Sequence, residues 1–240
     1  MPELIESETP DEVRSRPEPI APWFHTAFLL CVLTLWAFYG LLHSRVLVSV
    51  MPRGASYISH IIIECLLVGS TIAGLYHRRR FISDVFGTIT PRGAAIDLAQ
   101  GALLYLAGTA VLIGIWFVLK PLHPGYQREA VRAMAPRTPL EFALWIAVSI
   151  AAGACEEFVF RGYLLRQFER WWGSVWLPVV VTSVLFGGLH LYEGWGAVVE
   201  IAGLGALYAI VAVRRGNLRS VLVAHFLQDA LTGLFFYLRH

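Results

Sequence analysis

The chain consists largely of long apolar runs separated by short segments that carry arginine and proline. We place these runs at residues 23–44, 57–77, 95–119, 140–166, 175–192, 196–213 and 219–238. A helix needs about 20 apolar residues to cross the hydrocarbon core of a bilayer. The composition agrees, because 57% of the residues are hydrophobic and only 15% are charged. The sequence therefore predicts an all-α fold, a polytopic transmembrane helix bundle of about seven spans.

Composition divides the chain into three parts. Residues 1–22 are acidic and rich in proline, so we expect a disordered N-terminal tail that cannot bury enough apolar surface to fold. Residues 23–139 hold the first three spans and their connecting loops. Residues 140–238 hold four spans that carry polar residues inside their apolar runs. We therefore treat this last part as a separate region of the membrane bundle.

The placement of the basic residues favours one orientation of the bundle. With the N-terminus inside, the inner side would receive Arg78, Arg79, Arg80, Arg92, Arg161, Arg166, Arg170, Arg214, Arg215 and Arg219. The outer side would receive Arg45, Arg53, Lys120, Arg128, Arg132, Arg137 and Arg239. We therefore predict a multi-pass protein of the plasma (inner) membrane with a cytoplasmic N-terminus. Because the cations fall at span ends rather than on one face, no nucleic-acid partner is expected.

Two adjacent carboxylates interrupt one of the most apolar segments. Glu156 and Glu157 lie within the fourth run, and Arg161 follows four residues after Glu157. An acid near the bilayer centre costs about 2.5–3.5 kcal/mol, so a chain that carries two normally uses them for pairing, transport or chemistry. Residues four apart share a helix face, whereas neighbours diverge by about 100°. We therefore expect Glu157 to pair with Arg161, and Glu156 to need a partner from another helix.

Two later runs offer such partners. His190 follows Gly187 and Gly188, two small residues that would let another helix approach closely. His225 and Asp229 lie four residues apart in the last run and share a face. At 1.5 Å per residue, these groups lie roughly 9–22 Å from the inner interface. We predict a common cavity lined by Glu156, His190, His225 and Asp229.

Such a cavity would suit hydrolysis by an activated water molecule. A carboxylate shielded from solvent becomes a stronger base, and imidazoles can hold the water or stabilise an oxyanion. Two histidines with one or two acids also form a zinc-like set of donors with an open position for water. The residues are thus compatible with a metal-free mechanism. They are equally compatible with Zn²⁺ or another divalent metal bound by Glu156, His190, His225 and Asp229.

Three motifs in this order resemble one family of membrane enzymes. Glu-Glu-x-x-x-Arg at 156–161, Phe-x-x-x-His at 186–190 and His-x-x-x-Asp at 225–229 are similar to motifs of the CAAX-processing and bacteriocin-processing (CPBP, or Abi) intramembrane proteases. That family includes the Ras-converting CAAX prenyl endopeptidases. The resemblance covers about residues 140–238 and implies that they form the catalytic membrane core. The earlier spans match only as generic membrane helices.

The resemblance implies a role for each motif residue. Glu156 would be the general base that activates water with the help of His190, and Glu157 and Arg161 would form a supporting pair. His225 and the residue at 229 would stabilise the oxyanion, and Phe186 would pack the site. The prenyl-protease branch typically carries asparagine at the last position, where this chain has Asp229. Because an ionised aspartate cannot donate a hydrogen bond, Asp229 must be protonated, bind a metal or orient a histidine.

The function expected from this reasoning is that of an intramembrane endopeptidase. Its partners would be the lipid bilayer and a membrane-bound protein or peptide substrate. Candidate substrates are a prenylated CAAX peptide, a bacteriocin-type leader and a membrane-bound regulator. One alternative is a catalytically silent scaffold or bacteriocin-immunity protein of the same fold. The other is an ion- or proton-coupled transporter, which predicts broken helices and inverted repeats that the sequence does not show.

Other polar residues in the apolar runs are expected to lie near interfaces or to pack as polar groups. These are Glu64, Asp97, Glu141 and Glu200, of which Glu64 is the best further candidate for the cavity. Four histidines are expected at span ends or in helix packing: His25, His43, His60 and His77.

Overall fold

The computed structural model describes residues 18–80, 82, 90–121 and 129–239. Most of the tail predicted to be disordered therefore lies outside the described residues. Its last residues depart from that prediction, because Ile20 and Ala21 are buried and their backbone nitrogens donate hydrogen bonds to Oε1 of Gln167. Within them the chain is helical and forms no strand. The helices are α2 (Trp23–Val50), α3 (Arg53–His77), α5 (Pro91–Leu119), α6 (Glu129–Met134), α7 (Pro139–Glu157), η1 (Phe158–Leu164), α8 (Leu165–Trp172), α9 (Trp176–Leu189), η2 (Leu191–Glu193), α10 (Trp195–Arg215) and α11 (Arg219–Tyr237).

Six helical segments are long and apolar enough to cross a membrane, and a seventh, α9, is apolar but shorter. The prediction of an all-α polytopic bundle of about seven spans is therefore confirmed. The fourth run departs from the predicted single helix that ends at residue 166, because α7, η1 and α8 form one continuous rod that reaches Trp172. Its middle part, η1, is a π-helix.

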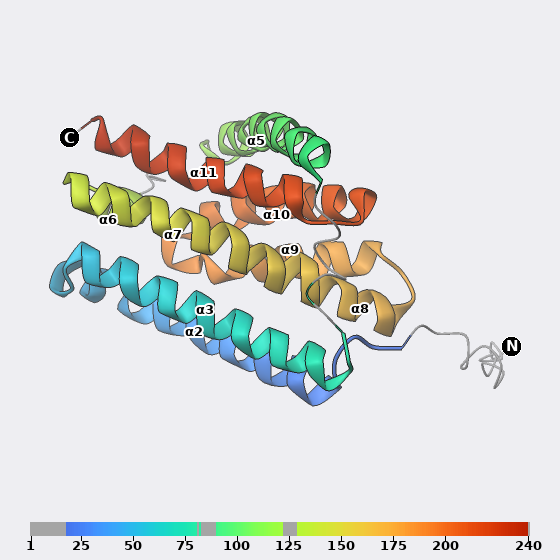
Figure 1. Cartoon of the computed structure of the whole chain (residues 1–240). Coiled ribbons are helices and arrows are strands. Elements are labelled where there is room, and N and C mark those ends of the chain that lie inside the picture. The colour runs from blue at the N-terminus through green and yellow to red at the C-terminus, as the bar shows by residue number, and fades with distance from the viewer. Residues whose placement is uncertain (1–17, 81, 83–89, 122–128, 240) are drawn as a thin grey trace, which may run out of the picture.

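The helix α7 lies at the centre of the bundle. It packs against α3 on one side and α11 on the other, and α11 in turn packs against α5 (Figure 1). The helix α10 packs against α9 and α5, and α2 contacts α3, α9 and η2. The helix α9 contacts η1, so the segments that hold the predicted site residues meet around the continuous rod of α7 and η1, although they lie far apart in the sequence.

Local signals explain where several helices begin and end. Thr90 and Thr138 cap α5 and α7 by accepting hydrogen bonds from the chain three residues later, and each is followed by proline at the first helical position. Glu141 completes a capping box with Thr138. Gly173 and Gly216 end α8 and α10 in the left-handed conformation that favours glycine.

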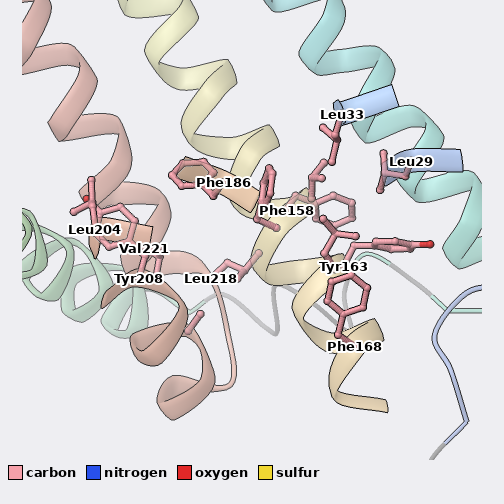
Figure 2. Close-up of a cluster of buried hydrophobic side chains, with 14 of the residues drawn as sticks. Leu29, Leu33, Phe158, Tyr163, Phe168, Phe186, Leu204, Tyr208, Leu218 and Val221 are labelled. Atoms are coloured by element: carbon pink, nitrogen blue, oxygen red, sulfur yellow. The ribbon is translucent and has the colours of Figure 1, made fainter. Parts of the chain in front are cut away.

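The buried core surrounds the π-helical segment. All seven residues of η1 are buried, and Phe158 and Tyr163 pack with Phe168 of α8 and Phe186 of α9 (Figure 2). By contrast, many large apolar side chains on the long helices are exposed, as Leu103 of α5 is at 66%. Such a surface suits lipid rather than water. The core therefore holds the central rod in place inside an apolar shell.

The arginines predicted for the inner side gather at one end of the bundle. The end of α3, the start of α5, α8, the end of α10 and the start of α11 all lie at the right-hand end of Figure 1. Asp97 of α5 pairs there with Arg215 and Arg219. Arg161 is the exception, because it is buried inside the bundle. That this end faces the cytoplasm remains a prediction.

Candidate active site

Glu157 is the centre of a buried polar chain that joins three helices. Its Oε1 accepts a hydrogen bond from Arg161 Nη1 at 2.9 Å, as the four-residue spacing predicts. The same oxygen accepts another from His225 Nδ1 of α11 at 2.8 Å. Arg161 Nη2 also donates to the carbonyl oxygen of Gly205 in α10 at 3.0 Å. This chain pairs the buried charges through Glu157 Oε1, while Glu157 Oε2 has no hydrogen-bond partner among the described residues. It also fixes His225 with Nε2 as its free nitrogen.

Glu156 does not join the Glu157–Arg161 pair, as predicted, and it approaches a residue of another helix. Its Oε2 lies 3.7 Å from Nε2 of His225, and within the described chain this buried oxygen has no hydrogen-bond partner. On the other side, Glu156 faces His60 and Glu64 of α3. The carboxylate is thus held between two helices without an arginine or lysine beside it, which leaves it available to a ligand or a water molecule.

His190 lies where a short helix ends inside the bundle. The helix α9 has 14 residues and is therefore about 21 Å long, less than the thickness of a bilayer core. His190 Nδ1 is 3.0 Å from the carbonyl oxygen of Phe186. Because a carbonyl only accepts, Nδ1 carries the proton and Nε2 has a free lone pair. The predicted fifth span is correspondingly too long, since the helix stops at Leu189.

The predicted residues share one cavity. A cavity of about 230 Å³ is lined by Glu156, His190, His225 and Asp229 together with Phe186. Water occupies about 30 Å³ in the liquid, so the space holds several water molecules or a short stretch of peptide. A second cavity of about 380 Å³ opens at the arginine-rich end, where Arg80, Arg166 and Arg170 line it. Glu156 and the two site histidines do not line that second cavity.

Phe186 packs three of the site residues at once. Its ring centroid lies 5.3 Å from that of His190 and 6.0 Å from that of His225, edge to face in each case. The guanidinium of Arg161 lies 4.4 Å from the same centroid, within cation–π range. The side chain belongs to the buried cluster labelled in Figure 2. It therefore has the packing position that the resemblance implies.

Asp229 and Tyr208 complete the polar lining of the cavity. Asp229 Oδ2 lies 3.5 Å from His225 Nε2, so the carboxylate can orient this imidazole. Tyr208 of α10 is fully buried, and its hydroxyl has no hydrogen-bond partner among the described residues. Tyr208 did not emerge from the sequence, where a lone tyrosine in an apolar helix carries no signal. Its hydroxyl adds a hydrogen-bond donor that an ionised Asp229 lacks.

The helix α3 contributes two residues to this region. His60 lines the cavity, so its expected role in packing or at a span end is wrong. Glu64 is buried and lies in one group with His60 and Glu156. This agrees with the prediction that Glu64 is the best further candidate for the cavity. Glu200 of α10 also lines the cavity. The His-x-x-x-Glu spacing at 60–64 is the signal that could have identified the α3 pair, since it matches the one-turn spacing of His225 and Asp229.

Close helix contacts hold these groups together. A Cβ atom on Gly187 would lie 2.4 Å from the carbonyl oxygen of Val198, so this glycine allows α9 to approach α10. Gly188 has no atom within 4 Å of such a position, and the prediction that it also serves close approach is wrong. A Cβ on Gly153 would lie 3.2 Å from the backbone nitrogen of Phe226, where α7 meets α11. The site therefore depends on backbone contacts at two helix pairs.

Other polar residues pack as the sequence suggested. His25 Nε2 donates to the carbonyl oxygen of Ser70, which leaves Nδ1 to accept from the Tyr163 hydroxyl at 2.8 Å. Glu141 lies at the start of α7, where it is 3.9 Å from Arg53. Both groups lie outside the cavity lining, so they serve structure rather than the site.

These features define an integral, multi-pass membrane protein whose helices enclose a site of carboxylates and histidines. Residues 138–231 match a family model described as type II CAAX prenyl endopeptidase Rce1-like. This match covers all three motifs, so the resemblance seen in them to the CAAX-processing protease family is confirmed. Searches of curated proteins and of solved structures found no match.

Proposed function

We propose that the chain is an intramembrane endopeptidase in which Glu156 and His190 activate water for hydrolysis of a peptide bond. The observation that carries the proposal is the environment of Glu156. Its Oε2 is buried, has no hydrogen-bond partner within the described chain and faces a cavity that His190 and His225 also line. A carboxylate in such a place can accept a proton, and the cavity has room for water and a peptide bond.

In this mechanism the two residues divide the work on water. His190 Nε2 accepts a hydrogen bond from the water molecule, because its Nδ1 proton is already donated to Phe186. Glu156 removes a proton as the water oxygen attacks the carbonyl carbon. Glu156 then delivers that proton to the amide nitrogen, the carbon–nitrogen bond breaks, and a new carboxyl and a new amine form.

The negative charge on the tetrahedral intermediate requires donors in the same cavity. The buried Tyr208 hydroxyl is one such donor. His225 supplies a second one when Nε2 carries a proton, because Nδ1 remains bonded to Glu157. Asp229 would then orient His225 rather than donate to the oxyanion itself, which accounts for aspartate at a position where the prenyl-protease branch has asparagine.

The same residues have the donor atoms of a divalent metal site. Nε2 of His225 has carboxylate oxygens of Asp229 and Glu156 at 3.5 and 3.7 Å, and nitrogen and oxygen donors of this kind suit zinc. Glu156, His190, His225 and Asp229 would hold such an ion only after their side chains moved closer, because no three of their donor atoms lie within 4.8 Å of one another in the described structure. The ion would supply Lewis acidity toward the water. Glu157 and Arg161 would still fix the orientation of His225.

The substrate we propose is a membrane-tethered peptide, with a prenylated CAAX-type C-terminus as the first candidate. The matching family model is described as a prenyl endopeptidase, and the outer faces of the helices would place the cavity within reach of a lipid-anchored chain. We also propose that the arginine-rich end faces the cytoplasm of a cell whose plasma membrane holds the protein.

The test is cleavage of a panel of membrane-tethered peptides by purified protein in liposomes. We expect Glu156→Ala and His190→Ala to lose at least about 100-fold in rate, the usual contribution of a positioned acid or base. Glu169→Gln on α8 is the matched control, because this carboxylate lies at the arginine-rich end and outside the cavity lined by Glu156. Undiminished cleavage by both site variants would refute the assignment of these residues.

A further inference from the structure

An imidazole and a carboxylate of α3 lie directly opposite Glu156. His60 and Glu64 are four residues apart and therefore project from the same face of α3. Each of the three side chains offers one ligand atom, and these atoms all lie within 4.8 Å of one another. No other group of three or more histidine, cysteine and acidic residues among the described parts of the chain meets this condition. The α3–α7 packing thus assembles one compact set of donors.

The buried carboxylates of this set lack a cation. The Glu64 side chain is only 7% exposed, and its Oε2 has no hydrogen-bond partner in the described structure. The Glu156 side chain is 14% exposed, and its Oε2 also has no hydrogen-bond partner in the described structure. The described residues that line the neighbouring cavity include no lysine or arginine. Two buried acids so close together require a shared proton or a bound cation, because unpaired buried charge is costly.

We propose that His60, Glu64 and Glu156 bind a single divalent cation of the zinc type. His60 Nε2 and Glu64 Oε1 are 3.6 Å apart. Ligand bonds of about 2.0–2.1 Å in a tetrahedral site place neighbouring donors about 3.3–3.4 Å apart. The His60–Glu64 pair therefore needs only a small contraction, whereas Glu156, whose donor lies within 4.8 Å of the other two, would have to move closer by up to about 1.5 Å. One imidazole and two carboxylates leave the fourth position for water, the arrangement typical of catalytic zinc.

This site differs from the metal set expected from the motifs, with which it shares only Glu156. The proposal that the ion binds depends only on the geometry of α3 and α7. The proposal that the ion takes part in hydrolysis rests on the proposed function. Through Glu156 the ion would adjoin the water that attacks the peptide. The role of His190 and His225 would then be to contact the substrate and the oxyanion rather than to bind the metal.

The experiment measures binding of Zn²⁺ to purified, chelator-treated protein by isothermal titration calorimetry. Visible spectra after Co²⁺ substitution report the coordination geometry. We expect one Zn²⁺ per chain and four-coordinate Co²⁺ spectra. Removal of groups that merely support ligands lowers metal affinity about 10–100-fold, so Glu64→Gln and His60→Ala should each weaken binding by at least about 100-fold. His77→Ala is the control, because His77 lies exposed at the end of the same helix.

Two results would overturn this site: a wild-type protein that binds no Zn²⁺, or variants that bind it as tightly as the wild type. Thermal unfolding guards against a trivial loss of fold, since Zn²⁺ should raise the Tm of the wild type but not that of Glu64→Gln. Zinc binding without cleavage of any peptide would refute the proposed function and leave the ion site standing. Cleavage of a peptide by a protein that binds no zinc would refute the ion site and leave the proposed function standing.

Discussion

Removing the cation of the buried pair should destabilise the protein more than any change at the surface. In Arg161→Met, Glu157 loses its 2.9 Å partner while remaining fully buried, and the carbonyl oxygen of Gly205 loses a donor. Breaking a buried ion pair on one side costs about 3–5 kcal/mol. For a protein of this size each kcal/mol lowers the Tm by about 2–4 °C, so we expect a fall of roughly 6–20 °C.

The assay is thermal unfolding in detergent micelles or liposomes, with two companion variants. Arg170→Met on α8 removes a partly exposed arginine and should change stability by no more than about 0.5 kcal/mol. Combining Arg161→Met with Glu157→Gln removes the orphaned charge, so the double variant should regain at least about 2 kcal/mol over Arg161→Met alone. A fall of less than about 2 °C for Arg161→Met, or strictly additive losses in the double variant, would refute the reasoning.

Three further changes test separate parts of the structure. Gly187→Ala should lower the free energy of unfolding by about 1–3 kcal/mol, because the added Cβ would meet the backbone of α10. Gly188→Ala, where a Cβ would meet no atom, should be neutral or stabilising. Equal Tm values for the two variants would count against the α9–α10 contact. Tyr208→Phe should lower kcat about 10²–10³-fold with KM and Tm nearly unchanged, and an unaltered kcat would exclude this hydroxyl from the oxyanion site. Gln167→Leu should lower the free energy of unfolding by about 2–4 kcal/mol, because the side-chain amide makes three hydrogen bonds to the backbone of residues 20–21. A loss below about 0.5 kcal/mol would show that this contact does not stabilise the protein.

The spans and the Glu157–Arg161 pair could be predicted because they depend on local features. A run of about 20 apolar residues identifies a membrane helix wherever it packs, and a four-residue spacing places two side chains on one face in any helix. The common cavity could be anticipated because Glu156 had no partner on its own helix. In each case the relevant interaction lies within one helix or follows from a charge that needs compensation.

The parts that the sequence did not reveal depend on which helices become neighbours. Glu64 was anticipated as a cavity residue, but His60 was not, and both reach Glu156 only because α3 packs along α7. A lone histidine or glutamate in an apolar run does not say which helix it will face. The π-helical turn at Phe158–Leu164 likewise has no simple sequence signature. The length of α9 was overestimated because the apolar run continues past Leu189, where the chain leaves the helix.

The central claim is that Glu156 acts as a base on water rather than as a nucleophile. Single-turnover cleavage of a membrane-tethered peptide in H₂¹⁸O tests it, with mass spectrometry of the new C-terminus. We predict one ¹⁸O atom in that carboxyl group in the first turnover of the wild type, and a rate about 10²–10⁴-fold lower for Glu156→Gln. Unlabelled product with ¹⁸O retained on Glu156, or a Glu156→Gln rate equal to that of the wild type, would contradict the claim.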